Sequence, residues 1–425
     1  MTDSRPYIQA IHINKVRHLE NIDIPLDNTQ PRHLILTGPN GCGKTSLLQT
    51  LRTYLDGAQN GQLLRIEPLR SNIASWDAAI HRHEQRLTTP LTDGEQASLQ
   101  GQIAGFRQSI AQAQSQIDQF SHATPTLYNL PALIEGYQQG LFLLSYFDAK
   151  RSTAIKAVTG AQKLDLPKVS PMTSSVGARF LQFLVNQENR AALLQRKGDT
   201  AGVEAIERWM KNLTVQFRKL FQDQGLELKY DIDNFDYTIH LPGREPFRLV
   251  DNQLSDGFSA VLQIVAELLM RMEAAAGHAN GYNTPGIVLI DEIETHLHIK
   301  LQKTILPFLT AFFPSIQFIV TTHSPFVLTS LPDAVIFDLE TRRRWENISP
   351  LSASTVIEDY FDLDLYSDEI KRQVAQLEAL IQLKPRNEDQ QREFAAICAQ
   401  LEVLDYDQAP ELVAQYRALL TKDAH

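Results

Sequence analysis

The stretch HLILTGPNGCGKTSLL, residues 33–48, decides the fold class of this 425-residue chain. An apolar run typical of a buried strand enters a glycine-rich loop, and a segment of helical character follows from Ser46. Gly38, Gly41 and Gly43 let the backbone of the loop curl so that successive N–H groups point at one phosphate chain. This order of strand, loop and helix is the context that a phosphate-binding loop requires. The stretch therefore predicts a nucleotide-binding α/β domain.

The polar end of the loop supplies groups that hold a nucleotide and its metal ion. Lys44 is expected to reach the β- and γ-phosphate oxygens, and the Thr45 hydroxyl is expected to ligate Mg²⁺. We therefore predict ATP and Mg²⁺ as ligands. The residues expected to contact them here are Gly38, Pro39, Asn40, Gly41, Cys42, Gly43, Lys44, Thr45 and Ser46.

Two further strand-like runs end in polar residues that suit the same chemistry. Residues 287–292, IVLIDE, form an apolar run that delivers two carboxylates at its end, as a buried parallel strand does. Asp291 is expected to hold Mg²⁺, and Glu292 is expected to polarise the attacking water. Residues 318–325, FIVTTHSP, repeat the pattern, so His323 is predicted to contact the γ-phosphate.

A fourth element, LSDGF at residues 254–258, precedes a predicted helix. Ser255 and Gly257 would open that helix, whose N-terminus attracts anions. By itself the motif is equally typical of an ordinary helix cap. Its position shortly before the Asp291 strand favours a phosphate contact.

Composition argues against several other classes of protein. Hydrophobic residues make up 43% and charged residues 21%, as in ordinary globular proteins. The N-terminus has no basic stretch leading into an apolar block, so we expect no secretory signal. The apolar runs at 141–147 and 286–290 are far too short for a membrane span. Cys42 and Cys398 cannot form a disulfide framework or a four-ligand zinc site. We expect a cytoplasmic location and no membrane contact.

Residues 71–122 differ in pattern from the rest of the chain. Apolar positions recur at alternating spacings of three and four on both sides of Pro90 and Gly94, which predicts an antiparallel helical hairpin, a short coiled coil. Two ordinary surface helices are the alternative. The predicted organisation is an α/β head with an N-terminal lobe at 1–70, the hairpin at 71–122, a C-terminal lobe at 123–345 and a helical C-terminal region at 346–425.

Together these motifs resemble the ATP-binding-cassette (ABC) heads of the RecF, SMC and OLD group of ATPases. Members of that group carry an LSxG signature, an apolar strand ending in Asp-Glu and a downstream THSP. Residues 293–298, IETHLH, also resemble the segment that follows the catalytic Glu in OLD-like ATPases. The resemblance covers residues 7–70 and roughly 140–340, and it implies that Arg17 approaches the nucleotide. No Q-loop glutamine is assigned.

The resemblance implies that ATP is sandwiched between two heads, so the chain would form a homo-oligomer that is at least a head-to-head dimer. One head would then present Lys44, Thr45, Asp291, Glu292 and His323 to Ser255 and Gly257 of another.

A head without a TOPRIM domain resembles the stand-alone ATPases of bacterial anti-phage modules such as Septu and PARIS. This implies a separate effector, an HNH or TOPRIM nuclease, docked on residues 346–425 and the outer surface of the head. Asp362-Leu363-Asp364 matches an Asp-x-Asp nuclease pair, but no apolar strand precedes it. We therefore expect no nuclease site within the chain.

An alternative function, a RecF-like ATPase that maintains DNA and binds it across paired heads, stays open. Residues 150–168 favour it, while the net charge of −10 counts against it. The stretch sets five cations against the single acid Asp165: Lys150, Arg151, Lys156, Lys163 and Lys168. A metal site at His296 and His298 is not expected, because no third ligand lies nearby in the sequence.

Overall fold

The computed structural model describes residues 5–151, 155–250, 256–276, 283–348, 368–383 and 385–402, together with residues 417, 419 and 420. The chain divides into two compact units, Met1–Leu351 and Ser352–His425. In the part of the chain that the structure describes, no helix combines the length and apolar character needed to cross a membrane.

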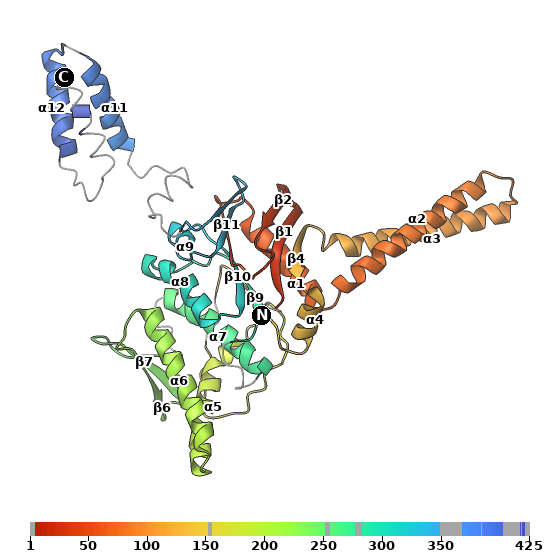
Figure 1. Ribbon diagram of the computed structural model, residues 1–425, viewed down its shortest axis with the longest axis horizontal. Coiled ribbons are helices and arrows are strands. Elements are labelled where there is room, and N and C mark those ends of the chain that lie inside the picture. Colours follow the sequence, from red (N-terminus) through yellow and green to blue (C-terminus); the bar gives the residue numbers. More distant parts are fainter. Residues whose placement is uncertain are drawn as a thin grey trace. The chain divides into compact units, whose positions relative to one another are not determined.

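A six-stranded sheet lies at the centre of the first unit (Figure 1), in the order β12-β11-β3-β10-β9-β5. Its strands are β3 (Leu34–Thr37), β5 (Leu143–Phe147), β9 (Gly286–Ile290), β10 (Ile316–Thr321), β11 (Val335–Asp338) and β12 (Arg343–Glu346). All neighbouring pairs are parallel except β11 with β12. Strands β3, β9, β10 and β11 are buried along their whole length, which explains their continuous apolar sequences. Parallel strands end at the same edge, so the polar residues after β3, β9 and β10 come together there.

A second, antiparallel sheet has the order β2-β1-β4. Its strands are β1 (Tyr7–Val16), β2 (Leu19–Pro25) and β4 (Ala123–Tyr128). It shares one hydrophobic core with helix α1 (Lys44–Gln59) and the central sheet, in which Ile11, Leu47 and Leu289 are fully buried. This core fixes the start of α1, and with it the glycine-rich loop, against both sheets.

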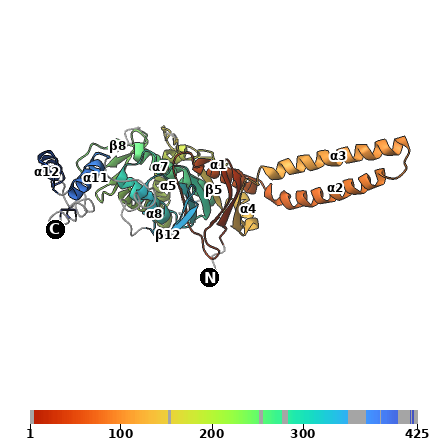
Figure 2. The same ribbon diagram turned by 90° about the horizontal axis from the view of Figure 1, so that it is seen from above.

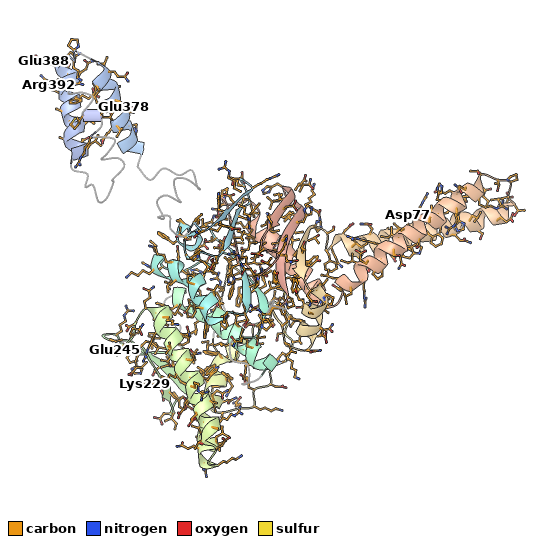
Figure 3. All side chains as sticks on the ribbon, viewed as in Figure 1. Asp77, Lys229, Glu245, Glu378, Glu388 and Arg392 are labelled. Atoms are coloured by element: carbon orange, nitrogen blue, oxygen red, sulfur yellow. The ribbon has the colours of Figure 1, made fainter. Side chains whose placement is uncertain are left out.

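Helices α2 (Ile66–Leu87) and α3 (Asp93–Asp118) form an antiparallel hairpin that extends away from the sheets (Figure 2). A short 3₁₀ turn, Leu63–Arg65, leads into it. Four apolar side chains are buried at its seam: Ile80, Ile103, Ala113 and Ile117. Asp77, on the hairpin in Figure 3, is exposed, as are most residues outside the seam. The hairpin begins at Ile66 and ends at Asp118, a few residues earlier at both ends than the expected range of 71–122. The spacing of apolar residues predicts the buried seam of a hairpin better than it predicts the ends of its helices.

The remaining elements of the first unit follow the hairpin along the chain. They are α4 (Leu130–Gln138), a 3₁₀ turn (Gly177–Arg179), α5 (Phe180–Arg196), α6 (Thr200–Phe221), β6 (Glu227–Asp231), β7 (Asp236–His240), β8 (Phe247–Arg248), α7 (Asp256–Ala276), α8 (Ile299–Phe312) and α9 (Pro325–Leu328). Strands β6, β7 and β8 make a small antiparallel sheet.

The described part of the second unit consists mainly of α11 (Asp368–Gln382) and α12 (Glu388–Glu402). They share a small core made of Val374, Leu377, Leu380, Ile397, Leu401 and Leu419. Arg392 forms an ion pair with Glu388 on α12 at 3.6 Å (Figure 3).

Candidate nucleotide site

The loop between β3 and α1 depends on glycine at two positions where a side chain does not fit. Gly38 has φ 130°, and a β-carbon there would lie 2.8 Å from Cys42 Sγ. Gly43 has φ 100°, and a β-carbon there would lie 2.9 Å from Leu19 Cδ1, next to the turn between β1 and β2. The loop is therefore a tight curl packed against that turn, which also carries the exposed Arg17.

Lys44 points its ammonium group back into this curl. The side chain is buried, and Nζ donates to the carbonyl oxygens of Gly38 at 2.7 Å and Pro39 at 3.0 Å. These acceptors carry no formal charge, so a phosphate oxygen would be a stronger partner for the ammonium group. Thr45 is exposed at the start of α1, and Ser46 is partly buried. The loop therefore fits a nucleotide triphosphate.

The turn after β9 holds two carboxylates in different surroundings. Asp291 is 3% exposed, and its Oδ1 accepts the Thr321 hydroxyl at 2.6 Å. The same hydroxyl oxygen accepts the Glu292 N–H at 2.7 Å. Glu292 has φ 43°, an unusual conformation for a residue other than glycine, and its Oε2 accepts the Thr295 hydroxyl at 3.2 Å. Thr321, at the end of β10, thus ties the two acids to the neighbouring strand.

His323 lies in the electrostatic field of both the loop and the turn. Its backbone N–H donates to Glu294 Oε1 at 2.5 Å. Burial and the nearby Lys44 cation lower the pKa of His323, while the carboxylates of Glu294, Glu292 and Asp291 act in the opposite direction. The structure therefore gathers Lys44, Asp291, Glu292 and His323 at one edge of the sheet, with a ring that is neutral at pH 7.

Of the two predicted signature residues, the structure describes only Gly257. Ser255 lies outside the described residues, whereas Gly257 is buried in the first turn of α7. A β-carbon at Gly257 would lie 2.8 Å from the His296 carbonyl oxygen, and its nearest neighbours come from residues 296–301 rather than from the phosphate loop. Gly257 lines a groove of about 720 Å³ together with Arg244, Phe258, His296, His298 and Lys300, among others.

Arg151 corrects one element of the sequence interpretation. We placed it in a basic stretch compatible with DNA, but it is partly buried and bonded to the turn after β9. Its guanidinium group donates to three successive carbonyl oxygens, those of Asp291 at 2.9 Å, Glu292 at 2.7 Å and Ile293 at 3.3 Å. Arg151 therefore contacts the candidate site and is not available to a phosphate backbone. Lys150, Lys156, Lys163 and Lys168 are exposed.

The described residues hold no group of three or more His, Cys, Asp or Glu side chains placed to bind a metal ion by themselves. A metal ion at Asp291 would therefore need oxygen ligands from the nucleotide and Thr45, as Mg²⁺ has in phosphate-loop enzymes.

A phosphate loop between β3 and α1, an acidic pair after β9 and a His after the intervening β10 define an ABC-type P-loop ATPase head. The chain has this α/β fold, and β3, the phosphate loop, α1 and the helical hairpin follow one another in the sequence between β2 and β4 of its antiparallel sheet.

The chain is similar to proteins named for two systems, a retron and Septu. Residues 177–329 match the family described as "AAA domain, putative AbiEii toxin, Type IV TA system". The chain is 23% identical over 412 residues to the Retron Vc95 probable ATPase of Vibrio cholerae serotype O1 biovar El Tor, covering 82% of this chain and 78% of that protein. It is 22% identical over 350 residues to the Septu protein PtuA of Bacillus mycoides (strain KBAB4), covering 80% of this chain and 42% of that protein.

Among solved structures, the chain is similar to an Smc head bound to the C-winged helix domain of ScpA. The identity is 12% and the TM-score 0.37, with 78% of this chain and 94% of that chain covered.

Proposed function

We propose that this chain binds and hydrolyses ATP with Mg²⁺, using the residues gathered at the carboxyl edge of the central sheet. The observation that carries the proposal is the convergence of Lys44, Asp291, Glu292 and His323, which come from three separate segments of the sequence. Three neighbouring parallel strands deliver these side chains to one place, where α/β sheets bind ligands.

Each side chain has a role that its surroundings support. Lys44 binds the β- and γ-phosphate oxygens, and Thr45 and Asp291 hold Mg²⁺. The bound metal ion neutralises charge on the phosphates. Glu292 orients a water and accepts its proton, while the Thr295 hydroxyl and the Thr321 hydroxyl fix the turn that carries it. The neutral His323 ring donates a hydrogen bond to the γ-phosphate.

Steady-state phosphate release tests this proposal directly. The Lys44→Ala variant should lose ATP turnover by about 100-fold or more, because a charged donor to the reacting phosphate is removed. Lys15→Ala is a matched control, since Lys15 forms an exposed ion pair with Glu20 on the antiparallel sheet. Wild-type protein without Mg²⁺-dependent ATP turnover, or a Lys44→Ala variant as active as Lys15→Ala, would contradict the assignment.

We further propose that two heads enclose the nucleotide, with Ser255 and Gly257 of one head facing the phosphate loop of the other. The start of α7 borders an open groove rather than its own phosphate loop, which supports a ligand supplied by a second copy. A helix N-terminus across the interface attracts the γ-phosphate, so ATP stabilises the assembly and hydrolysis releases it.

The biological role that we propose is control of a separate effector nuclease in an anti-phage module. The similarity to proteins named for the Septu and retron systems supports this role. Residues 352–425 contain 15 Asp and Glu against 7 Lys and Arg, and therefore carry most of the chain's net charge of −10. An acidic surface of this kind suits a basic partner, which here is an HNH or TOPRIM nuclease.

Co-expression with the product of the neighbouring open reading frame, followed by size exclusion at micromolar concentration, tests this role. We expect the two proteins to elute together and to separate at high salt. Separate elution at low salt would contradict the proposed docking. The Asp-x-Asp pair at 362–364 lies outside the described residues, so the proposal that the chain has no nuclease site rests on its sequence context.

The second candidate function is DNA binding across paired heads, favoured by the exposed Lys150, Lys156, Lys163 and Lys168. It predicts an ATP-stimulated DNA affinity that falls steeply with salt and is lost when Lys156 and Lys163 are both changed to Glu. Affinity that does not depend on these two lysines would exclude this surface.

A further inference from the structure

Arg151 is a cation next to the candidate site to which the ATPase mechanism proposed above gives no role. It follows β5, the edge strand that pairs with β9, and its guanidinium group reaches across to the turn after β9. The three carbonyl oxygens that it contacts belong to successive residues, Asp291, Glu292 and Ile293. Burial lowers the pKa of Arg151 to about 10, so the group stays charged at pH 7.

These contacts fix a turn whose backbone is strained. Glu292 adopts φ 43°, which L-residues adopt rarely and which costs free energy unless the surroundings enforce it. To accept from one guanidinium group, the three carbonyl oxygens must lie on the same side of the turn, and a planar guanidinium with several donors stabilises a turn conformation that places them there. The direction of the Glu292 side chain depends on the same backbone angles.

The 3₁₀ turn Gly177–Arg179 lies between the residues that follow Arg151 and helix α7. The Lys156 N–H donates to the Ala178 carbonyl oxygen at 3.0 Å, and the Gly177 N–H donates to Glu267 Oε2 of α7 at 2.6 Å. Glu267 in turn forms a buried ion pair with Arg271 at 2.7 Å. The Arg271 guanidinium donates to the Leu144 carbonyl oxygen of β5 at 3.1 Å.

We propose that Arg151 is a positioning residue for ATP hydrolysis, which holds the Asp291–Ile293 backbone so that the Glu292 carboxylate faces the attacking water. Arg151 also lines one pocket with Gln263 and Glu267 of α7, the helix that we propose meets the second head. The inference rests on the proposed ATPase function. It concerns the rate of hydrolysis and not the binding of the nucleotide, since Arg151 contacts backbone oxygens of the turn.

The test compares Arg151→Ala and Arg151→Lys in the full chain with Arg218→Ala. Arg218 is a matched control, because its Nε also donates to a backbone carbonyl oxygen, that of Leu226 at 2.8 Å, away from the nucleotide site. For each variant we would measure kcat, the affinity for a fluorescent ATP analogue and the thermal midpoint. Guanidinium at millimolar concentration would be added as a chemical substitute for the missing side chain.

We expect kcat of Arg151→Ala to fall by about 100-fold, since small displacements of a catalytic group cost that much. Nucleotide affinity should match that of Arg218→Ala. Arg151→Lys should also be slow, because one ammonium group cannot contact three carbonyls. Added guanidinium should raise kcat of Arg151→Ala but not of Arg218→Ala.

A purely structural role would give a different result. The inference would be overturned if Arg151→Ala had the same kcat as Arg218→Ala. It would also be overturned if kcat of Arg151→Ala were low and added guanidinium did not raise it. If Arg151→Ala does not fold, Arg151→Lys tests the inference in its place. A low kcat with unchanged nucleotide affinity would support the positioning role, and an unchanged kcat would overturn it. Absence of turnover in the wild-type protein would instead overturn the proposed ATPase function, so the two failures are distinguishable.

Discussion

His33, the residue before β3, gives the fold a pH dependence. Its Nδ1 accepts the Phe318 N–H of β10 at 3.1 Å, and burial lowers its pKa from 6.5 to about 4. Above pH 6.5 the ring is neutral in both states and its stabilising contact is complete. As pH falls from 6.5 toward 4 the unfolded chain binds the proton more readily, so the free energy of unfolding should decrease, by about 3 kcal/mol from this group alone.

Urea denaturation across this pH range measures the effect. His33→Asn, whose side chain has no proton to gain here, should show a weaker pH dependence than the wild-type protein. Equal pH dependence of the two proteins would show that His33 is not responsible.

Some residues of the candidate site could be predicted from sequence motifs, and others could not. Lys44, Asp291, Glu292 and His323 follow strand-like runs, so their convergence could be predicted once a parallel sheet was expected. Their catalytic roles stay predictions. Arg151 could not be recognised, because its partners are backbone carbonyls distant in the sequence, and a backbone contact leaves no residue pattern.

At the scale of elements, two glycines in helices should respond oppositely to alanine. A β-carbon at Gly57 of α1 would lie 2.3 Å from Cε1 of the buried Phe120, so Gly57→Ala should lower the free energy of unfolding by about 1–3 kcal/mol. At Gly105 of α3 nothing lies within 4 Å, and Gly105→Ala should stabilise the helix by about 0.5–1 kcal/mol. Urea denaturation and amide exchange in α3 would measure the two effects. Destabilisation by both substitutions would contradict the packing found here.

Most helices and strands of the head could be predicted from periodicity, including β9 at 286–290 and β10 at 316–321. The strands β4, β11 and β12 were not predicted, since they are as short as β3, β9 and β10 but no recognised motif follows them. Trp345 of β12, for example, has charged neighbours in the sequence, so no apolar run marks the strand. β12 forms because it pairs antiparallel with β11.

For the whole molecule, the sequence predicts a nucleotide-binding head and a helical C-terminal region at 346–425, and the structure divides the chain into two units after Leu351. The number of heads in the assembly and the identity of the effector depend on surfaces of other molecules. No motif within one chain encodes them, and they remain proposals here.

We propose that ATP holds two heads together until Glu292 promotes its hydrolysis. The most direct test is the molar mass of Glu292→Gln, measured by light scattering after size exclusion with MgATP and without nucleotide. We predict that the variant binds ATP, hydrolyses it slowly and accumulates as an ATP-dependent oligomer of at least two chains. A variant that turns over ATP like the wild-type protein, or whose mass is the same with and without ATP, would contradict the account.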